Sequence, residues 1–238
     1  MKLTLPAFDT RKKGRTLLKA YAAFCVLYFL SGNLQLRQAV PLPEFAPDQL
    51  IPLLGWTIWV YLSQFLFLGL AIGLLHNPVK VNRVVYSMLL ATALSSIVFL
   101  AFPTRLPPRE LQEAGLIKMT FDSVDLMFAI TNTNCFPSLH VALAFLAALG
   151  LRDERRNLFP VALLWAASIS ISTLTAKQHY FIDVVAGPPL ALLCHRVVRR
   201  VEWFHFPSLV GGRGAFGESS PRETPNEVGL QNEEVRCR

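Results

Sequence analysis

The sequence predicts an all-α integral membrane protein, and three observations support this class. Of the 238 residues, 53% are hydrophobic and only 16% are charged, whereas soluble domains carry roughly 25% charged residues. The mean hydropathy is +0.40. The apolar residues gather in long charge-free runs, and several runs are long enough to cross a bilayer as helices. An ordinary soluble domain is therefore excluded.

Six of these runs predict six transmembrane helices in one bundle. A basic N-terminus, 1–19, precedes the first run, and we expect it to be cytoplasmic. A Gly- and Ser-rich tail, 204–238, follows the last run, and its composition is typical of a disordered segment. The membrane domain therefore covers 20–203. The predicted spans are 20–36, 49–79 (which includes a turn at Asn77-Pro78), 84–104, 137–151, 158–176 and 179–201.

A further helix is expected in the polar loop between the third and fourth spans. Ile117, Phe121, Val124 and Phe128 fall on one helical face. This pattern predicts a short interfacial helix that lies over a site. An ordinary loop helix is the alternative.

The distribution of basic residues predicts the orientation. Most of the 23 lysines and arginines fall on the side of the six spans that holds both termini, and this excess places both termini in the cytoplasm. The formal net charge of +7 is thus explained by the membrane topology. No basic stripe with interleaved aromatic residues indicates a nucleic-acid partner. We expect a plasma (inner) membrane protein with its site facing the periplasm, the exterior or a lumen.

Two motifs at the outer ends of the fourth and sixth spans carry the chemistry. They are Cys-Phe-Pro-Ser-Leu-His at 135–140 and Lys-Gln-His-Tyr-Phe-Ile-Asp at 177–183. On a helix, His179 and Asp183 would stand one turn apart on one face. The carboxylate then accepts a hydrogen bond from the N–H of one imidazole nitrogen, which leaves the other nitrogen free to attack. His140 is expected in the first turn of a different helix, whose start suits an anion.

Nearby cations indicate that the ligand of this site is a phosphate. Arg105 and Arg109 flank Leu-Pro-Pro, and the prolines stiffen the backbone that carries the two guanidinium groups. Lys177 could add a third cation. Loop arginines that reach lipid headgroups are the alternative for the two arginines. Two histidines and an aspartate are also a metal-ligand set, but the cations would repel a divalent ion, and we expect no metal.

The motifs resemble those of the type 2 phosphatidic acid phosphatase superfamily. Residues 137–140, Pro-Ser-Leu-His, correspond to the family's Pro-Ser-Gly-His motif, in the form used by the inositol-phosphorylceramide-synthase-like branch. His179 and Asp183 match the family's His-x-x-x-Asp. Two departures are visible. Ser172-Thr173 stands where the family has Ser-Arg, and 104–109, Thr-Arg-Leu-Pro-Pro-Arg, stands in place of Lys-x6-Arg-Pro.

The resemblance implies a six-helix lipid phosphatase or phosphotransferase that needs neither metal nor cofactor. His179 would form a phosphohistidine, Asp183 would orient its ring, and His140 would serve as general acid and base. The residues implied to hold the phosphate are Arg105, Arg109, Ser138 and Lys177.

The substrate would be a phospholipid, sphingolipid or isoprenoid phosphate. With water as acceptor the protein is a phosphatase. With an alcohol it is a headgroup transferase like inositol-phosphorylceramide or sphingomyelin synthases. An alternative of another class is a non-catalytic membrane protein that binds anionic lipids or transports an anion.

Overall fold

The computed structural model describes residues 4–6, 13–34, 36–107, 111, 113–128 and 133–204. The chain divides into two units, Met1–Phe206, to which all described residues belong, and Pro207–Arg238. The second unit, which makes up most of the tail predicted to be disordered, lies outside the described residues.

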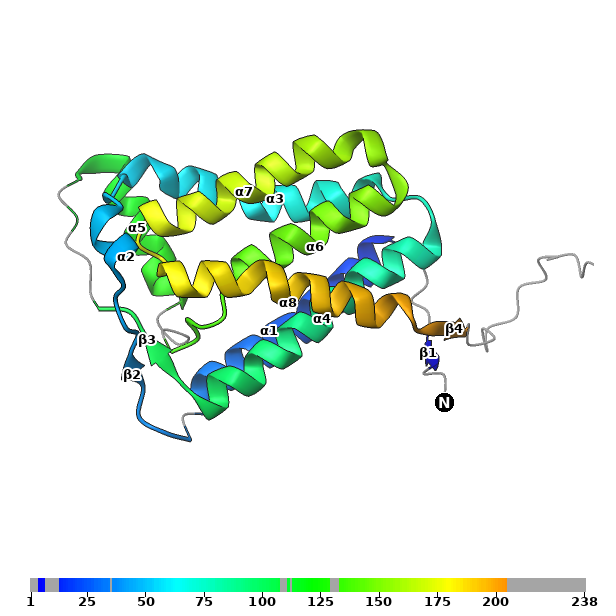
Figure 1. The fold of residues 1–238 in the computed structure, drawn as a ribbon, viewed down its shortest axis with the longest axis horizontal. Coiled ribbons are helices and arrows are strands. Elements are labelled where there is room, and N and C mark those ends of the chain that lie inside the picture. Colours follow the sequence, from blue (N-terminus) through cyan, green and yellow to red (C-terminus); the bar gives the residue numbers. More distant parts are fainter. Residues whose placement is uncertain are drawn as a thin grey trace, which may run out of the picture. The chain divides into compact units, whose positions relative to one another are not determined.

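The described residues form a helical bundle, as the sequence predicts (Figure 1). Among the described residues, short strands form two parallel pairs, β1 (Thr4–Pro6) with β4 (Glu202–Phe204) and β2 (Val40–Pro41) with β3 (Thr104–Arg105). Two 3-10 turns, η2 (Gly55–Thr57) and η4 (Arg156–Leu158), precede α3 and α7. The α-helices are α1 (Lys13–Asn33), α2 (Ala46–Leu50), α3 (Ile58–Leu74), α4 (Pro78–Ala101), α5 (Gly115–Phe128), α6 (Leu139–Glu154), α7 (Phe159–Thr175) and α8 (Phe181–Arg199).

Within the part of the chain that the structure describes, four helical segments are long and apolar enough to cross a membrane: Gly55–Leu74, Pro78–Ala101, Arg156–Thr175 and Phe181–Arg199. The other two predicted spans correspond to α1 and α6. Helix α6 has only 16 residues, about 24 Å at 1.5 Å per residue, which is short of a bilayer core of about 30 Å. Integral membrane character is therefore established, whereas the count of six spans stays a prediction.

Helix α6 forms the core of the bundle (Figure 1). It packs against α3, α4, α7 and α8. Small side chains such as Ala144, Ala147 and Ala148 are fully buried or nearly so along it, and small residues let helices approach closely. At Gly150 an added Cβ would clash with the Val84 side chain of α4. The sequence of α6 thus sets how tightly its neighbours pack.

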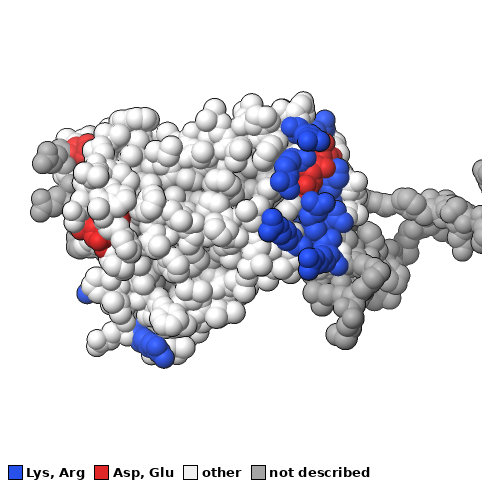
Figure 2. All heavy atoms as spheres, in the orientation of Figure 1, with Lys and Arg blue, Asp and Glu red and all other residues white. Residues whose placement is uncertain are grey.

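One end of the bundle is strongly basic, as the band of Lys and Arg in Figure 2 shows. At this end the Asp153 carboxylate lies 3.3 Å from His195 Nε2 and 3.8 Å from Arg199 Nη1, and so joins α6 to α8. The arginines here, at the ends of α6 and α8 and in η4, are Arg152, Arg155, Arg156, Arg196, Arg199 and Arg200.

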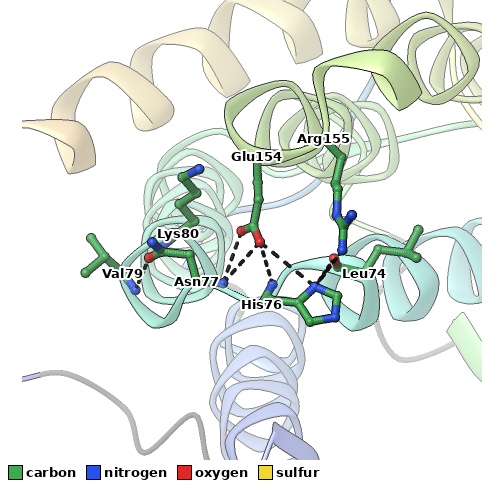
Figure 3. Close-up of polar contacts among 7 residues, drawn as sticks. All are labelled: Leu74, His76, Asn77, Val79, Lys80, Glu154 and Arg155. Atoms are coloured by element: carbon green, nitrogen blue, oxygen red, sulfur yellow. Dashed lines mark hydrogen bonds and ion pairs between the residues drawn. The ribbon is translucent and has the colours of Figure 1, made fainter.

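A carboxylate from α6 fastens the turn between α3 and α4 at the basic end (Figure 3). Glu154 Oε1 accepts hydrogen bonds from the backbone N–H groups of His76, at 2.8 Å, and Asn77, at 3.1 Å. Asn77 caps α4, because its Oδ1 accepts from Val79 N at 2.9 Å. The predicted turn at Asn77-Pro78 is confirmed. The candidate site lies at the opposite end of the bundle, where α6 and α8 begin.

Candidate active site

The first histidine of the site lies just before α8. The sequence predicted His179 and Asp183 on one helix, but α8 begins at Phe181, so His179 belongs to the turn between α7 and α8. Asp183 bends back over this turn. Its Oδ2 accepts a hydrogen bond from the N–H of the N-cap residue Tyr180 at 3.1 Å, and it lies 3.2 Å from His179 Nδ1. The predicted pairing is therefore present, and helix capping produces it.

The pair fixes which nitrogen of His179 is available. Asp183 is fully buried and His179 is 8% exposed. An ionised carboxylate can only accept, so Nδ1 carries the proton that it donates to Asp183. The lone pair of the ring then sits on Nε2. This geometry prepares Nε2 to act as a nucleophile.

The second histidine lies at the start of α6. Ser138 is the N-cap, where its hydroxyl oxygen accepts a hydrogen bond from Val141 N at 3.4 Å, and His140 is in the first turn as predicted. The N–H of Ser138 donates to the Asp183 carbonyl at 3.2 Å. This bond ties the first turns of α6 and α8 together. The ring centroids of His140 and His179 lie 6.0 Å apart.

A glycine allows the two helices to meet here. A Cβ at Gly187, one turn beyond Asp183, would lie 2.6 Å from Val141 Cγ1 and 3.2 Å from Ala142 N. Real Cβ atoms do not approach that closely, because optimal carbon–carbon contacts are at about 3.5–4.0 Å. Gly187 therefore permits the approach of α8 to α6 on which the proximity of the two histidines depends.

Sequence reasoning missed Tyr61, which stacks on His140. The centroids lie 4.4 Å apart with 22° between the planes. Tyr61 belongs to an apolar cluster at the end of α3 that includes Phe121 and Val124 of α5. Helix α5 thus lies against this end of α3 through three residues of its predicted apolar face, with Ile117 packed beside Phe121 and Val124. The Phe128 side chain lies outside the described residues. Tyr61 sits within an apolar run, so nothing in the sequence marks it.

Asp48 is the second residue that sequence reasoning missed. It is 2% exposed, and its Oδ1 accepts a hydrogen bond from the N–H of Phe181, the first residue of α8, at 2.7 Å. Its Oδ2 accepts from Phe45 N at 2.9 Å. Asp48 therefore holds the start of α8 next to His179. The only signal in the sequence is an acidic residue at the end of a proline-rich loop.

The predicted phosphate-binding residues occupy different places. The Lys177 ammonium donates to the backbone carbonyl of Asp48 at 2.7 Å. Arg105 is exposed on β3, a strand anchored beside the segment that leads into α6 by a hydrogen bond from Phe136 N to Thr104 Oγ1 at 3.2 Å. Arg109 lies outside the described residues. Ser138 therefore bonds to Asp183 and Lys177 bonds to Asp48. Arg105 is exposed and makes neither contact.

Among the described residues, no group of three His, Cys, Asp or Glu side chains is arranged to hold a metal ion.

The fold and the site define a class: a helical membrane protein in which a carboxylate-paired histidine and a second histidine meet at two helix starts. The comparisons agree with this class. A family model described as PAP2 superfamily matches residues 51–197, more than half of the chain. The protein belongs to that superfamily, the type 2 phosphatidic acid phosphatases, whose members are in general phosphatases or phosphotransferases. The matched range includes His140, His179 and Asp183. A search of curated proteins finds no match.

Proposed function

We propose that the protein is an integral membrane lipid phosphatase or phosphotransferase that works through a phosphohistidine at His179. The observation that carries this proposal is the 3.2 Å contact between Asp183 Oδ2 and His179 Nδ1, with the His140 ring 6.0 Å away. An oriented imidazole with a free Nε2 is a nucleophile. A second imidazole at this distance can reach the oxygen that departs from the same phosphoryl group.

The first half of the reaction transfers the phosphoryl group to the enzyme. His179 Nε2 attacks phosphorus, a P–N bond forms and the P–O bond to the lipid breaks. Protonated His140 gives its proton to the departing oxygen. Asp183 stays ionised and stabilises the positive charge of the phosphorylated ring.

The second half releases the phosphoryl group to an acceptor. Neutral His140 removes a proton from water or an alcohol, the acceptor oxygen attacks phosphorus and the P–N bond breaks. Acid–base catalysis of this kind contributes about 10²–10⁴-fold. Water as acceptor makes the protein a phosphatase, and an alcohol makes it a headgroup transferase of the inositol-phosphorylceramide-synthase-like kind.

Four residues are proposed to hold the phosphate oxygens: Arg105, Arg109, Ser138 and Lys177. The Lys177 ammonium has three N–H donors, and the Asp48 carbonyl takes one of them, which leaves donors for an anion. The Ser138 oxygen accepts from Val141 N, so its O–H proton can be donated. The Arg105 guanidinium is exposed beside the segment that leads to His140 and can bind phosphate bidentately.

The basic band supports an orientation with the site outside the cytoplasm. Lys and Arg concentrate at the end of the bundle opposite His140 and His179 (Figure 2), and basic ends of membrane bundles face the cytoplasm. We therefore propose that both termini are cytoplasmic and that the site faces the exterior, periplasm or lumen.

The decisive experiment incubates the purified protein with labelled phospholipid, sphingolipid and isoprenoid phosphates, with and without an inositol or diacylglycerol acceptor. The proposal expects product from the native chain in the presence of EDTA, none from His179→Ala, and an acid-labile phosphoenzyme at residue 179. Activity lost in EDTA and restored by a metal ion would reject the phosphohistidine route. Tight lipid binding without turnover, unchanged in His179→Ala, would instead favour a non-catalytic binding protein.

A further inference from the structure

An apolar cavity of about 340 Å³ lies beside the candidate site. It is formed between α1, α3 and α4, with His140 and Leu139 of α6 at one end. Helix α1 packs against α4, and side chains such as Phe24 of α1 and Leu68 of α3 line the space that remains between α1 and α3. The cavity is thus continuous with the residue proposed to act as general acid.

The cavity is elongated along the helices. On α1 its lining runs from Leu17 to Phe29, and twelve residues at 1.5 Å each correspond to about 18 Å of helix. Phe29 lies toward the end of α1 that approaches the site, because Asn134, close before α6, donates to the carbonyl of Tyr28 at 2.9 Å. An occupant with its head at His140 therefore extends a long apolar body along the bundle.

One polar side chain stands out in this apolar lining. Gln64 is 3% exposed, lines the cavity, and its Oε1 is buried without a hydrogen-bond partner in the described part of the chain. It lies one helical turn from Tyr61, which stacks on His140. A buried amide oxygen without a donor is costly. A ligand that brings a donor just below its phosphate would remove that cost.

We infer that the cavity binds the hydrocarbon chain of a single-chain lipid phosphate, with Gln64 Oε1 accepting a hydrogen bond from a hydroxyl or amide N–H between phosphate and chain. The inference rests on the proposed function and adds the substrate class. The volume lies at the lower end of the roughly 300–1,000 Å³ of small-molecule sites, which suits one chain. An ester at the junction, as in a diacyl lipid, offers no donor to Gln64.

The test compares three probes: 1-oleoyl lysophosphatidate, its analogue with hydrogen in place of the free glycerol hydroxyl, and p-nitrophenyl phosphate, which has no chain. Gly69 lines the cavity and a Cβ there meets nothing within 4 Å, so Gly69→Phe fills the cavity from an open position. Gly73 on the same helix has equal space and is not among the lining residues, so Gly73→Phe is the matched control. Gly69→Leu serves where Gly69→Phe does not fold.

We expect Gly69→Phe to lower kcat/KM for the lipid at least tenfold and to leave release of p-nitrophenol within twofold of the native rate. Gly73→Phe should match the native protein on both probes. Gln64→Met, which keeps length and removes the amide, should erase a preference of about fivefold for the hydroxyl-bearing lipid, the size of one net hydrogen bond. Native lipid kinetics in Gly69→Phe, or a preference that survives in Gln64→Met, would overturn the inference.

A phosphonate analogue of the single-chain lipid separates this inference from the proposed function, because binding is measured without turnover. Binding to the native protein and to Gly73→Phe but not to Gly69→Phe, with no turnover of any probe, keeps the chain site and rejects the enzyme. Turnover of p-nitrophenyl phosphate with equal phosphonate affinity in all three proteins keeps the enzyme and rejects the chain site.

Discussion

The close contact at Gly187 predicts that adding one methyl group there, in Gly187→Ala, moves His179 away from His140. In Gly187→Ala the new Cβ would lie 2.6 Å from Val141 Cγ1 and 2.7 Å from Val141 Cβ. Optimal carbon–carbon contacts are at about 3.5–4.0 Å, so α8 must move from α6 by about 1 Å. Overpacking of this kind costs about 1–3 kcal/mol of unfolding free energy, and a 1 Å misplacement of catalytic groups can cost about 10²-fold in rate.

The assay measures kcat on a lipid phosphate and thermal unfolding in the same detergent. Gly73→Ala is the matched control, because a Cβ at Gly73 meets nothing within 4 Å, and this change should stabilise the helix by up to about 1 kcal/mol without changing kcat. Adding Val141→Gly to Gly187→Ala removes the clashing side chain, so the double variant should regain activity and be less destabilised than the two single changes summed. Native unfolding temperature and native kcat in Gly187→Ala would refute the reasoning.

Three further predictions follow from single contacts. Asp183→Asn should lower kcat by about 10²–10⁴-fold, because an amide cannot stabilise the positively charged ring of His179, and circular dichroism should show an unchanged fold. Asp48→Ala leaves the N–H of Phe181 without its acceptor and should cost about 1–3 kcal/mol in thermal unfolding and also lower kcat. Glu154→Ala removes the acceptor of two exposed N–H groups, which water can replace, so it should cost only about 0.5–1.5 kcal/mol and leave kcat unchanged, since Glu154 lies at the other end of the bundle. Burial, aided by the charge of Asp183, raises the pKa of the Cys135 thiol to about 12, so mass spectrometry should find Cys135 unmodified by maleimide at pH 8 until the protein is unfolded; labelling of the folded protein would contradict this.

The parts of the fold that follow from local sequence were predictable. Charge-free runs located the long helices, and the prediction that His140 lies in a first helical turn is confirmed. The first and last residues of the helices were less predictable. An apolar run marks only the part of a helix inside the membrane, whereas the backbone hydrogen bonds of the helix continue beyond that part. Helix α1 accordingly begins at Lys13 and not at residue 20. His179 was assigned to the same helix as Asp183 because of their four-residue spacing. That spacing alone cannot reveal that Asp183 caps the helix at Tyr180.

The support around the two histidines could not be predicted from one sequence. Tyr61 and Asp48 come from segments far from both motifs, and their roles depend on how α3 and the loop before it fold against α6 and α8. A tyrosine in an apolar run and an aspartate in a loop have no distinctive spacing. Only the three-dimensional packing brings Tyr61 onto His140 and Asp48 onto the first N–H of α8.

The start of α8 carries carboxylates, so the cations of the proposed phosphate site must come from elsewhere. The N–H groups of Phe181 and Tyr180 donate to the carboxylates of Asp48 and Asp183, so these donors, which helix starts commonly offer to anions, are already occupied. A phosphate at His179 would therefore meet two buried negative charges. It must be held from the start of α6 and by side-chain cations, of which Lys177 is fixed beside Asp48.

The departure from the family's Ser-Arg lies in the same region. The arginine position is taken by Thr173, which is fully buried, and the Thr173 carbonyl accepts the N–H of His179 at 3.2 Å. The end of α7 thus positions His179 through its backbone, while the Thr173 side chain is buried. The positive charge that a phosphate requires has to come from outside α7, and Lys177, in the turn that carries His179, is the nearest cation along the chain to supply it.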